Sequence, residues 1–222
     1  MILHIEGIAK SYKRKSVLKN VSFQAERGNC IGILGGNGAG KSTLLSVLAG
    51  IQAPDVGSFT FNGFDLFKNG SKRSAIVGYV PQDTPLIPEL SAKDNLLLWY
   101  DRKTMEIELE KGVLNLLGIN DFLRIPVKKM SGGMKKRLSI GCAMSGKPPI
   151  LLLDEPTAAL DLVCKRDIAK YLESYTNAGG IVIMTTHDVT ELSACDMCYI
   201  MKDGQLQPYV YDGNVNALIE QL

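Results

Sequence analysis

The sequence predicts an α/β fold built on a parallel sheet, and three short stretches are the basis of that prediction. Residues 30–34, 150–154 and 181–185 are mainly apolar runs of strand length, typical of strands buried on both faces of a parallel sheet. The first run leads into a glycine-rich loop and then into a helical segment. The chain of 222 residues is long enough to bury a sizeable core as one domain, with or without a subdomain.

The first residues predict a small β unit ahead of that loop. Residues 2–8 alternate enough to form a strand, and a second strand is expected around residues 21–25. Between them lies a polar loop, residues 11–16, that contains Tyr12. Tyr12 is either a half-buried loop aromatic, the commoner fate, or a platform for a purine ring, since base stacking on an aromatic is worth about 1–3 kcal/mol.

Residues 35–43 have the pattern of a phosphate-binding loop, because Gly-x-x-x-x-Gly-Lys-Ser follows a strand and opens a helix predicted over residues 41–50. Glycines let backbone N–H groups converge on an anion, and the helix N-terminus adds partial positive charge. Lys41 can reach the β- and γ-phosphates, and Ser42 can ligate Mg²⁺. The alternative is a glycine-rich turn before a helix. The residues expected to bind the nucleotide are Gly35, Gly36, Asn37, Gly38, Ala39, Gly40, Lys41, Ser42 and Thr43.

The next segment predicts further strands. Residues 53–57 form a predicted turn, residues 58–62 a strand, and Gly63 lies in another turn. A strand over residues 76–80 is expected to end before Pro81-Gln82-Asp83, since proline cannot continue central pairing. Gln82 therefore lies where this strand leaves the sheet, which taken alone is the position of a solvated loop residue.

Residues 90–145 differ in character and predict helices inserted into the α/β core. Ser91 and Asp94 have the spacing of a capping box. Thr104 is expected to cap a second helix that Gly118 ends. Trp99 and Tyr100 are expected to be buried in this segment.

Two carboxylates follow the apolar run of residues 150–153, and open α/β sheets bind ligands at the carboxyl ends of their strands. Asp154 is expected to hold Mg²⁺, through water. Glu155 points to the other side of the chain and is placed to orient or deprotonate a water for in-line attack on a γ-phosphate. The structural alternative for both is the capping of a turn before proline.

The remaining elements follow from caps and turns. Asp161 predicts the N-cap of a helix that runs to about Tyr175, and His187 follows the strand of residues 181–185. An edge hairpin over residues 196–201 and 204–207 is expected, followed by a short helix near 215–221.

Ser131-Gly132-Gly133 is a second anion-binding pattern. Ser131 is expected to cap a helix whose first residues are glycines, which leaves backbone N–H groups open to an anion. The alternative is an ordinary cap with a solvated basic face. A second phosphate site in one monomer is redundant, and it makes sense if it serves a nucleotide bound by another subunit.

Composition and patterning argue against several classes of protein. The formal net charge of +2, with no dense basic block, does not call for nucleic acid. Five cysteines favour a reducing compartment over a disulfide framework, and the Cys195-x-x-Cys198 pair without a second pair is a poor zinc or redox motif. The N-terminus has no signal-peptide pattern, and no apolar run approaches the roughly 18 residues needed to cross a bilayer. We therefore expect a cytoplasmic protein that reaches a membrane only through a partner.

The chain resembles, over essentially its full length and in motif order, the ATP-binding cassette (ABC) ATPases of ABC transporters. Gly35 to Thr43 matches their Walker A motif, Ser131-Gly132-Gly133 their signature, and Ile150 to Glu155 their Walker B motif with the catalytic glutamate. Ala159-Leu160-Asp161 is similar to the D-loop. The remaining matches are single residues: Tyr12 with the adenine-stacking aromatic, Gln82 with the Q-loop glutamine and His187 with the switch histidine.

The resemblance implies a P-loop NTPase (RecA-like) fold in a single domain, residues 1–222. Residues 1–82 and 146–222 would form the core with an antiparallel β subdomain, and residues 83–145 the helical subdomain. It also implies ATP and Mg²⁺ as cofactors, with Ser42, Gln82 and Asp154 near the metal. Glu155, His187 and Lys41 would be catalytic.

The resemblance further implies partners. Two subunits, identical or paralogous, would sandwich two ATP molecules, with Ser131, Gly132 and Gly133 contacting the γ-phosphate held by the opposite Lys41. Closure would drive an integral membrane subunit at the inner face of the cell membrane. The signature departs from the family at Met130 and Met134, and Met134 favours an ABC-2-type exporter. The alternative is a soluble ABC ATPase that acts as an assembly or regulatory module.

Overall fold

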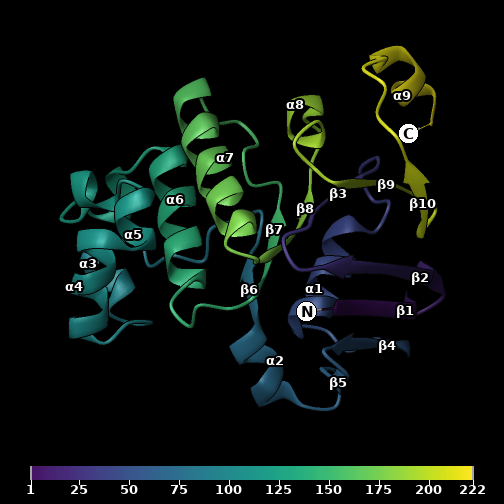
Figure 1. The fold of residues 1–222 in the computed structure, drawn as a ribbon, viewed down its shortest axis with the longest axis horizontal. Coiled ribbons are helices and arrows are strands. Elements are labelled where there is room, and N and C mark those ends of the chain that lie inside the picture. Colours follow the sequence, from purple (N-terminus) through teal and green to yellow (C-terminus); the bar gives the residue numbers. More distant parts are fainter. Residues whose placement is uncertain (1, 222) are drawn as a thin grey trace.

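A computed structural model describes residues 2–221, and its centre is a six-stranded sheet of order β10-β9-β3-β8-β7-β6 (Figure 1). Neighbouring strands from β9 to β6 are parallel, and β10 is an antiparallel edge. The strands are β3 (Cys30–Leu34), β6 (Val77–Val80), β7 (Ile150–Asp154), β8 (Ile181–Thr185), β9 (Met197–Lys202) and β10 (Gln205–Tyr209). The three apolar runs are therefore adjacent or near-adjacent strands, as the sequence predicts.

A second sheet of four antiparallel strands, order β2-β1-β4-β5, lies beside the first. It consists of β1 (Ile2–Tyr12), β2 (Lys15–Glu26), β4 (Val56–Phe61) and β5 (Phe64–Asp65). The polar loop predicted over residues 11–16 is shorter in the structure. Strand β1 includes Tyr12, β2 starts at Lys15, and these two residues pair with each other. The long hairpin thus keeps Tyr12 on a strand.

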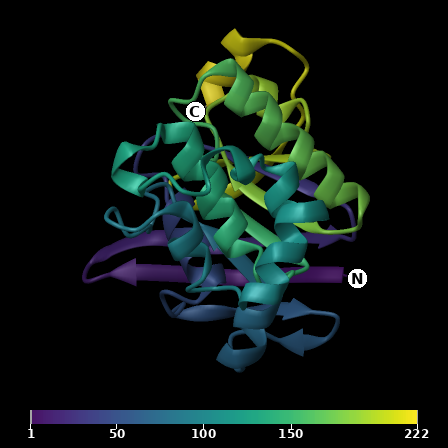
Figure 2. The ribbon, with the colours of Figure 1, turned by 90° about the vertical axis from the view of Figure 1, so that its left-hand side faces the viewer.

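Helices cover the remaining surfaces. The first group is α1 (Lys41–Ala49), α2 (Gly70–Ile76), α3 (Ala92–Leu96), α4 (Arg102–Lys111) and α5 (Val113–Leu116). Two 3-10 turns, η1 (Ile119–Phe122) and η2 (Val127–Lys129), lead into α6 (Gly132–Ala143). The second group is α7 (Leu162–Asn177), α8 (Val189–Leu192) and α9 (Val215–Gln221). Helices α3 to α6 form one side of the molecule, which faces the viewer in Figure 2, with α7 between them and β8 (Figures 1 and 2).

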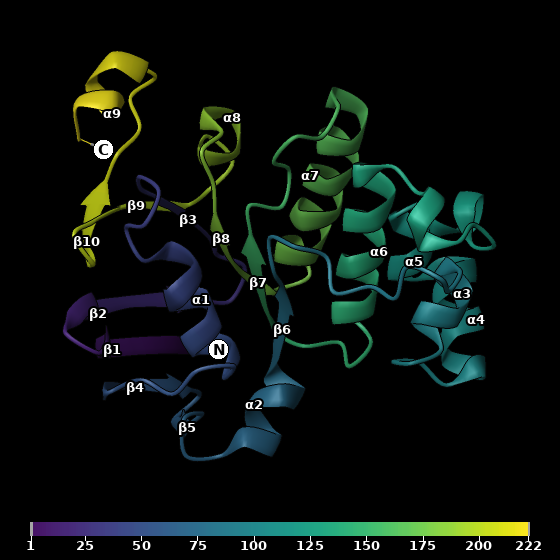
Figure 3. The ribbon, with the colours of Figure 1, turned by 180° about the vertical axis from the view of Figure 1, so that it is seen from behind.

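Successive residues of the central strands face two different cores, because side chains alternate across a sheet. On β7, Leu151 and Leu153 join the core that contains α6 and α7, whereas Ile150 and Leu152 join the core that contains α1. Helix α1 lies between the two sheets, as the view from behind shows (Figure 3). This double burial explains why the strand is apolar throughout until Asp154.

The cap of α4 and the exposure of Trp99 differ from the sequence prediction. Asp101, not Thr104, is the N-cap of α4, and its side chain accepts from the Thr104 N–H at 2.9 Å. Trp99 is 63% exposed, although Tyr100 is buried as expected. Leu96, Trp99 and Tyr100 lie near the end of α3, where only part of the apolar surface can face the core.

The capping box is confirmed, because Ser91 and Asp94 cap α3. The single helix expected to run to Gly118 is wrong, since α4 ends with its C-cap at Gly112 and a separate short helix, α5, follows it. Gly118, with a φ of 62°, comes directly after the C-cap of α5. None of the helices within residues 2–221 is both long and apolar enough to span a membrane.

Candidate nucleotide site

The loop after β3 is shaped by close backbone packing and opens onto helix α1. Gly35 has a φ of 158°, and a Cβ there would lie 2.4 Å from the carbonyl oxygen of Met201. Gly40 is the N-cap of α1 with a φ of 114° and provides no side-chain cap. The first N–H groups of α1 are therefore not occupied by a cap and are available to an anion.

A cavity of about 550 Å³ opens over this loop. Its lining brings together residues far apart in the sequence: Val17, Asn37, Gly38, Ala39, Gly40, Lys41, Ser42, Thr43, Gln82, Glu155 and His187. Apart from Val17 on β2, they lie in the segments that follow the carboxyl ends of parallel strands β3, β6, β7 and β8, where α/β sheets bind ligands. Among the described residues, this lining does not include Tyr12 or the predicted signature Ser131-Gly132-Gly133.

Lys41 lies inside the loop with only 6% of its surface exposed. Its Nζ donates to the carbonyl oxygens of Gly35 at 2.7 Å and Gly36 at 3.3 Å, and it lies 3.2 Å from His187 Nε2. Burial lowers the pKa of Lys41, while the charges of Glu155 and Asp154 oppose that shift. The ammonium group is thus held at the loop before any phosphate is bound.

Glu155 follows β7 and contacts one residue that follows β6 and one that follows β8. Its carboxylate accepts from Gln82 Nε2 at 3.1 Å through Oε2 and lies 3.2 Å from His187 Nε2 through Oε1. Its backbone is left-handed, with a φ of 47°, which is uncommon for a residue that is not glycine. The same imidazole nitrogen therefore approaches both Lys41 and Glu155. Sequence reasoning predicted these residues individually, and the structure brings them into one cluster.

Asp154 lies beneath this cluster and is only 2% exposed. Its Oδ1 accepts from the Thr185 hydroxyl at 2.6 Å, and that hydroxyl accepts from the Glu155 N–H at 3.0 Å. Thr185, on the neighbouring strand β8, thus fixes both Asp154 and Glu155. The sequence reasoning missed Thr185, since a threonine at the end of an apolar strand has no local signal for this contact.

The oxygen donors near the loop suit Mg²⁺. The described residues hold no cluster of three or more His, Cys, Asp and Glu side chains that could bind a metal alone. Mg²⁺ commonly uses one or two carboxylates together with substrate phosphates. Ser42 and Gln82 line the cavity, and the single carboxylate of Asp154 at the end of β7 completes a donor set that fits that ion. The donor set is hydroxyl, carboxylate and amide oxygen, which are hard ligands.

Ser131 begins helix α6, as predicted. Its Oγ accepts from the Met134 N–H at 3.3 Å, and both Ser131 and Gly132 are exposed. Gly133 is buried, and a Cβ there would lie 2.2 Å from Cys164 Sγ on α7. The second glycine therefore has a packing reason of its own.

Tyr12 ends strand β1 and is 42% exposed. Its hydroxyl donates to the Gln52 side chain, and the Lys10 ammonium lies 5.7 Å from its ring centroid. The ring is accessible, and its use as a stacking platform stays a prediction.

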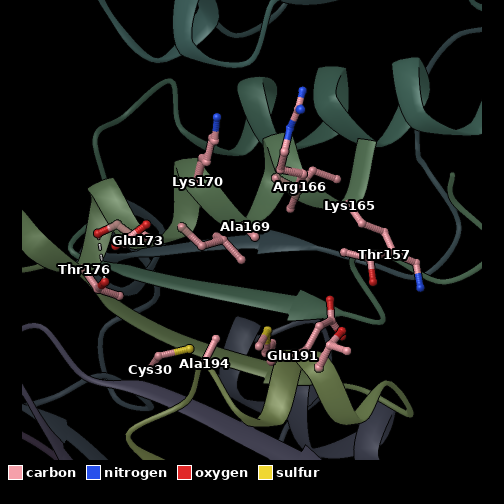
Figure 4. A pocket seen from close by; sticks show the side chains of 14 residues that line it. Cys30, Thr157, Lys165, Arg166, Ala169, Lys170, Glu173, Thr176, Glu191 and Ala194 are labelled. Carbon is pink, nitrogen blue, oxygen red and sulfur yellow. Dashed lines mark hydrogen bonds between the residues drawn. The ribbon is translucent and has the colours of Figure 1, made fainter. Parts of the chain in front are cut away.

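A second cavity of about 600 Å³ lies between α7 and α8 (Figure 4). Cys30, Thr157, Lys165 and Glu191 are among its lining residues, and it shares none of the predicted nucleotide residues. Cys30 Sγ lies 3.5 Å from Cys195 Sγ, so the Cys195-x-x-Cys198 pair packs against the start of β3. All five cysteines are free.

The chain is similar in sequence to known ATP-binding proteins of transporters. A family model described as ABC transporter matches residues 18–158. The Linearmycin resistance ATP-binding protein LnrL of Bacillus subtilis is 34% identical over 92% of this chain and 68% of its own length. The Nod factor export ATP-binding protein I of Sinorhizobium fredii is 34% identical over 99% of this chain, which spans 64% of that relative. The Lantibiotic transport ATP-binding protein SrtF of Streptococcus pyogenes is 30% identical over 97% of this chain and 93% of its own.

Solved structures agree with the fold. A dimeric ATP-binding cassette in a post-hydrolysis state, bound to ADP and Pi, superposes with a TM-score of 0.82 at 26% identity. The match covers 93% of this chain and 97% of that one.

Proposed function

The chain belongs to the ATP-binding cassette ATPases of ABC transporters, and we propose on that premise that it is the ATP-hydrolysing subunit of an exporter. The observation that carries the proposal is the cavity over the phosphate-binding loop, in which Lys41, Gln82, Glu155 and His187 meet. A soluble assembly module has no comparable support, because the relatives are named for resistance, export and transport.

Nucleotide binding falls to the loop and the first turn of α1. The N–H groups of residues 38–43 would surround the β- and γ-phosphates, and Lys41 would exchange its bonds to Gly35 and Gly36 for phosphate oxygens. That exchange is favourable because the buried ammonium gains a full negative charge in place of carbonyl dipoles. Tyr12 would contact the adenine ring.

Hydrolysis needs a base close to the γ-phosphate. Glu155 is that base: it would take a proton from the attacking water, while Gln82 and His187 hold its two carboxylate oxygens. Because His187 Nε2 also approaches Lys41, the imidazole orients the base relative to the phosphate-binding loop. Asp154, Ser42 and Gln82 would hold Mg²⁺, which when bound neutralises charge on the β- and γ-phosphates.

A second subunit would complete the site. Ser131 and Gly132 are exposed and lie outside the cavity lining of their own chain, so a helix start built for an anion has no phosphate in the same monomer. We assign it to the nucleotide of a facing copy or paralogue, in a sandwich dimer. The dimer would drive an integral membrane subunit from the cytoplasmic face, and the relatives named for export and lantibiotic transport support an exporter.

The test is Glu155→Gln, with Glu173→Gln on the exposed face of α7 as the matched control. We expect Glu155→Gln to bind ATP but to lose at least about tenfold in turnover, about 1.4 kcal/mol of barrier. Sedimentation with Mg-ATP is expected to give a dimer, because hydrolysis no longer reopens it. Unchanged turnover in a contaminant-free sample would exclude Glu155 as the base. A monomer that still binds ATP would exclude a homodimer and require a different partner subunit.

A further inference from the structure

Lys136 is a buried cation that the functions assigned so far do not use. It lies on α6, is only 5% exposed, and donates through Nζ to the carbonyl oxygens of Pro81 and Gln82, each at 3.1 Å. None of the ion pairs formed within residues 2–221 involves Lys136. An ammonium group is therefore held in the interior mainly by two carbonyl oxygens.

Those two carbonyls belong to the segment that leaves the sheet after β6. The strand ends at Val80, and Pro81 has no N–H with which to continue the ladder. The segment consequently has no sheet partner to fix it, and the Lys136 ammonium supplies two hydrogen bonds at that point. The next side chain along, Gln82, reaches Glu155 at 3.1 Å.

A purely structural role does not call for a charge at this position. Burial lowers the pKa of Lys136, which reflects the cost of keeping the ammonium away from water, and the charges of Asp154, Asp83 and Glu155 offset only part of that shift. A methionine of similar length would fill the space without that cost. The charge and the donors are thus the features that need an explanation.

We propose that Lys136 is a positioning residue that ties the signature helix to the Gln82 segment and so holds Gln82 against Glu155. The two ends of this link are functional: α6 begins at the signature glycines, and Gln82 lines the nucleotide cavity. A displacement of the start of α6 would pull the carbonyls of Pro81 and Gln82 with it. This inference rests on the proposed function, because it assigns Gln82 a part in hydrolysis.

The test compares Lys136→Met with Lys170→Met. Lys170 is an exposed lysine on α7, so its substitution removes the same charge from a helix without touching the Gln82 segment. With the full chain, we expect Lys136→Met to lower kcat at least about tenfold while ATP affinity without Mg²⁺ changes less than about twofold. Hydrogen exchange in the segment of residues 81–84 is expected to rise in Lys136→Met and not in Lys170→Met. Lys136→Arg, which keeps charge and donors, is expected to recover most of the turnover.

A double-mutant cycle with Gln82→Ala separates this inference from the proposed function. If Lys136 acts through Gln82, adding Lys136→Met to Gln82→Ala lowers turnover by less than about twofold more. The inference would be overturned if the turnover losses of the two single variants multiplied in the double variant. It would also be overturned if hydrogen exchange at residues 81–84 were unchanged in Lys136→Met. If Gln82→Ala alone leaves turnover unchanged, the role proposed for Gln82 fails, while the exchange measurement still decides whether Lys136 holds the segment. Should Lys136→Met not fold, Lys136→Gln is carried through the same cycle.

Discussion

The hydroxyl of Thr185 is expected to be worth far more than an ordinary threonine hydroxyl. It is completely buried, donates to Asp154 Oδ1 at 2.6 Å and accepts from the Glu155 N–H at 3.0 Å. Thr185→Val keeps the shape and removes both bonds. The N–H of Glu155 retains the Thr185 carbonyl at 3.2 Å, so the main loss is the bond to the Asp154 carboxylate. Hydrogen bonds to charged groups contribute about 1.5–3 kcal/mol, which is the expected loss in free energy of unfolding.

Urea unfolding followed by circular dichroism measures this loss directly. For a chain of this size the same change lowers Tm by roughly 3–12 °C. Thr176→Val is the matched control, because its hydroxyl donates to the Glu173 carbonyl near the end of α7 and meets no carboxylate. Turnover is expected to fall in Thr185→Val only, since Asp154 loses its orientation. A loss of stability below about 0.5 kcal/mol would refute the reasoning, because that is the range of an ordinary surface substitution.

Three further contacts can be tested by substitution, and one of them is the ion pair of Lys165 with Asp188, whose atoms Nζ and Oδ2 lie 2.6 Å apart. Lys41→Met should weaken ATP binding at least about tenfold by calorimetry, and wild-type affinity would contradict the phosphate-binding role. Gly133→Ala should cost about 1–3 kcal/mol of stability by overpacking, because its Cβ would lie 2.2 Å from Cys164 Sγ, and Cys164→Ala should restore most of the loss in the double variant. Hydrogen bonds from Lys165, and from the hydroxyl and N–H of Thr190, lower the pKa of Asp188 from its ordinary 3.8 to about 2. The stabilisation from these bonds is therefore present above about pH 4 and lost as pH falls toward about 2. Asp188→Asn should therefore lower Tm at pH 7 and flatten the dependence of Tm on pH in that acid window, and an unchanged slope would count against the pair.

The sequence predicts those parts of the fold whose causes are local. The strand that ends at Asp154 and the phosphate-binding loop are recognisable because burial on both faces and convergence on an anion each constrain consecutive residues. The caps at Ser91 and Asp161 are equally local, since each side chain bonds an N–H three residues on. In such segments, the side chains that determine the local structure lie within a few neighbouring positions.

Predictions of helix caps and of burial fail where two neighbouring residues can fill the same role, or where packing against distant segments determines the outcome. Asp101 and Thr104 can both cap a helix, and the aspartate, three residues earlier, does so. Helix α2 is absent from the sequence prediction because none of its residues is buried, so it has no apolar periodicity to detect. Trp99 is exposed because Tyr100 takes the inward position and donates to the Gly141 carbonyl at 2.8 Å.

The residues that organise the site are the hardest to predict, because they act between distant segments. Thr185 is separated from Asp154 by 31 positions and meets it only because β7 and β8 pair in parallel. Lys136 meets Gln82 across 54 positions. A motif predicts which groups would contact the nucleotide, whereas the groups that fix those side chains depend on strand register and helix packing.

The packing at the start of α6 also suggests how the binding of a second subunit would affect this chain. A Cβ on Gly132 would lie 3.5 Å from Leu160, and Gly133 packs directly against Cys164. Residues 159–161 lead into α7 through the Asp161 cap, so the starts of α6 and α7 form one packed edge. Because close-packed interiors transmit displacement rather than absorb it, an anion bound at Ser131 would act on this whole edge. Lys136 extends the same edge to Gln82. In the proposed sandwich dimer, the phosphate of one subunit would then be linked, through side chains of the other, to Gln82, the residue proposed to orient that other subunit's base.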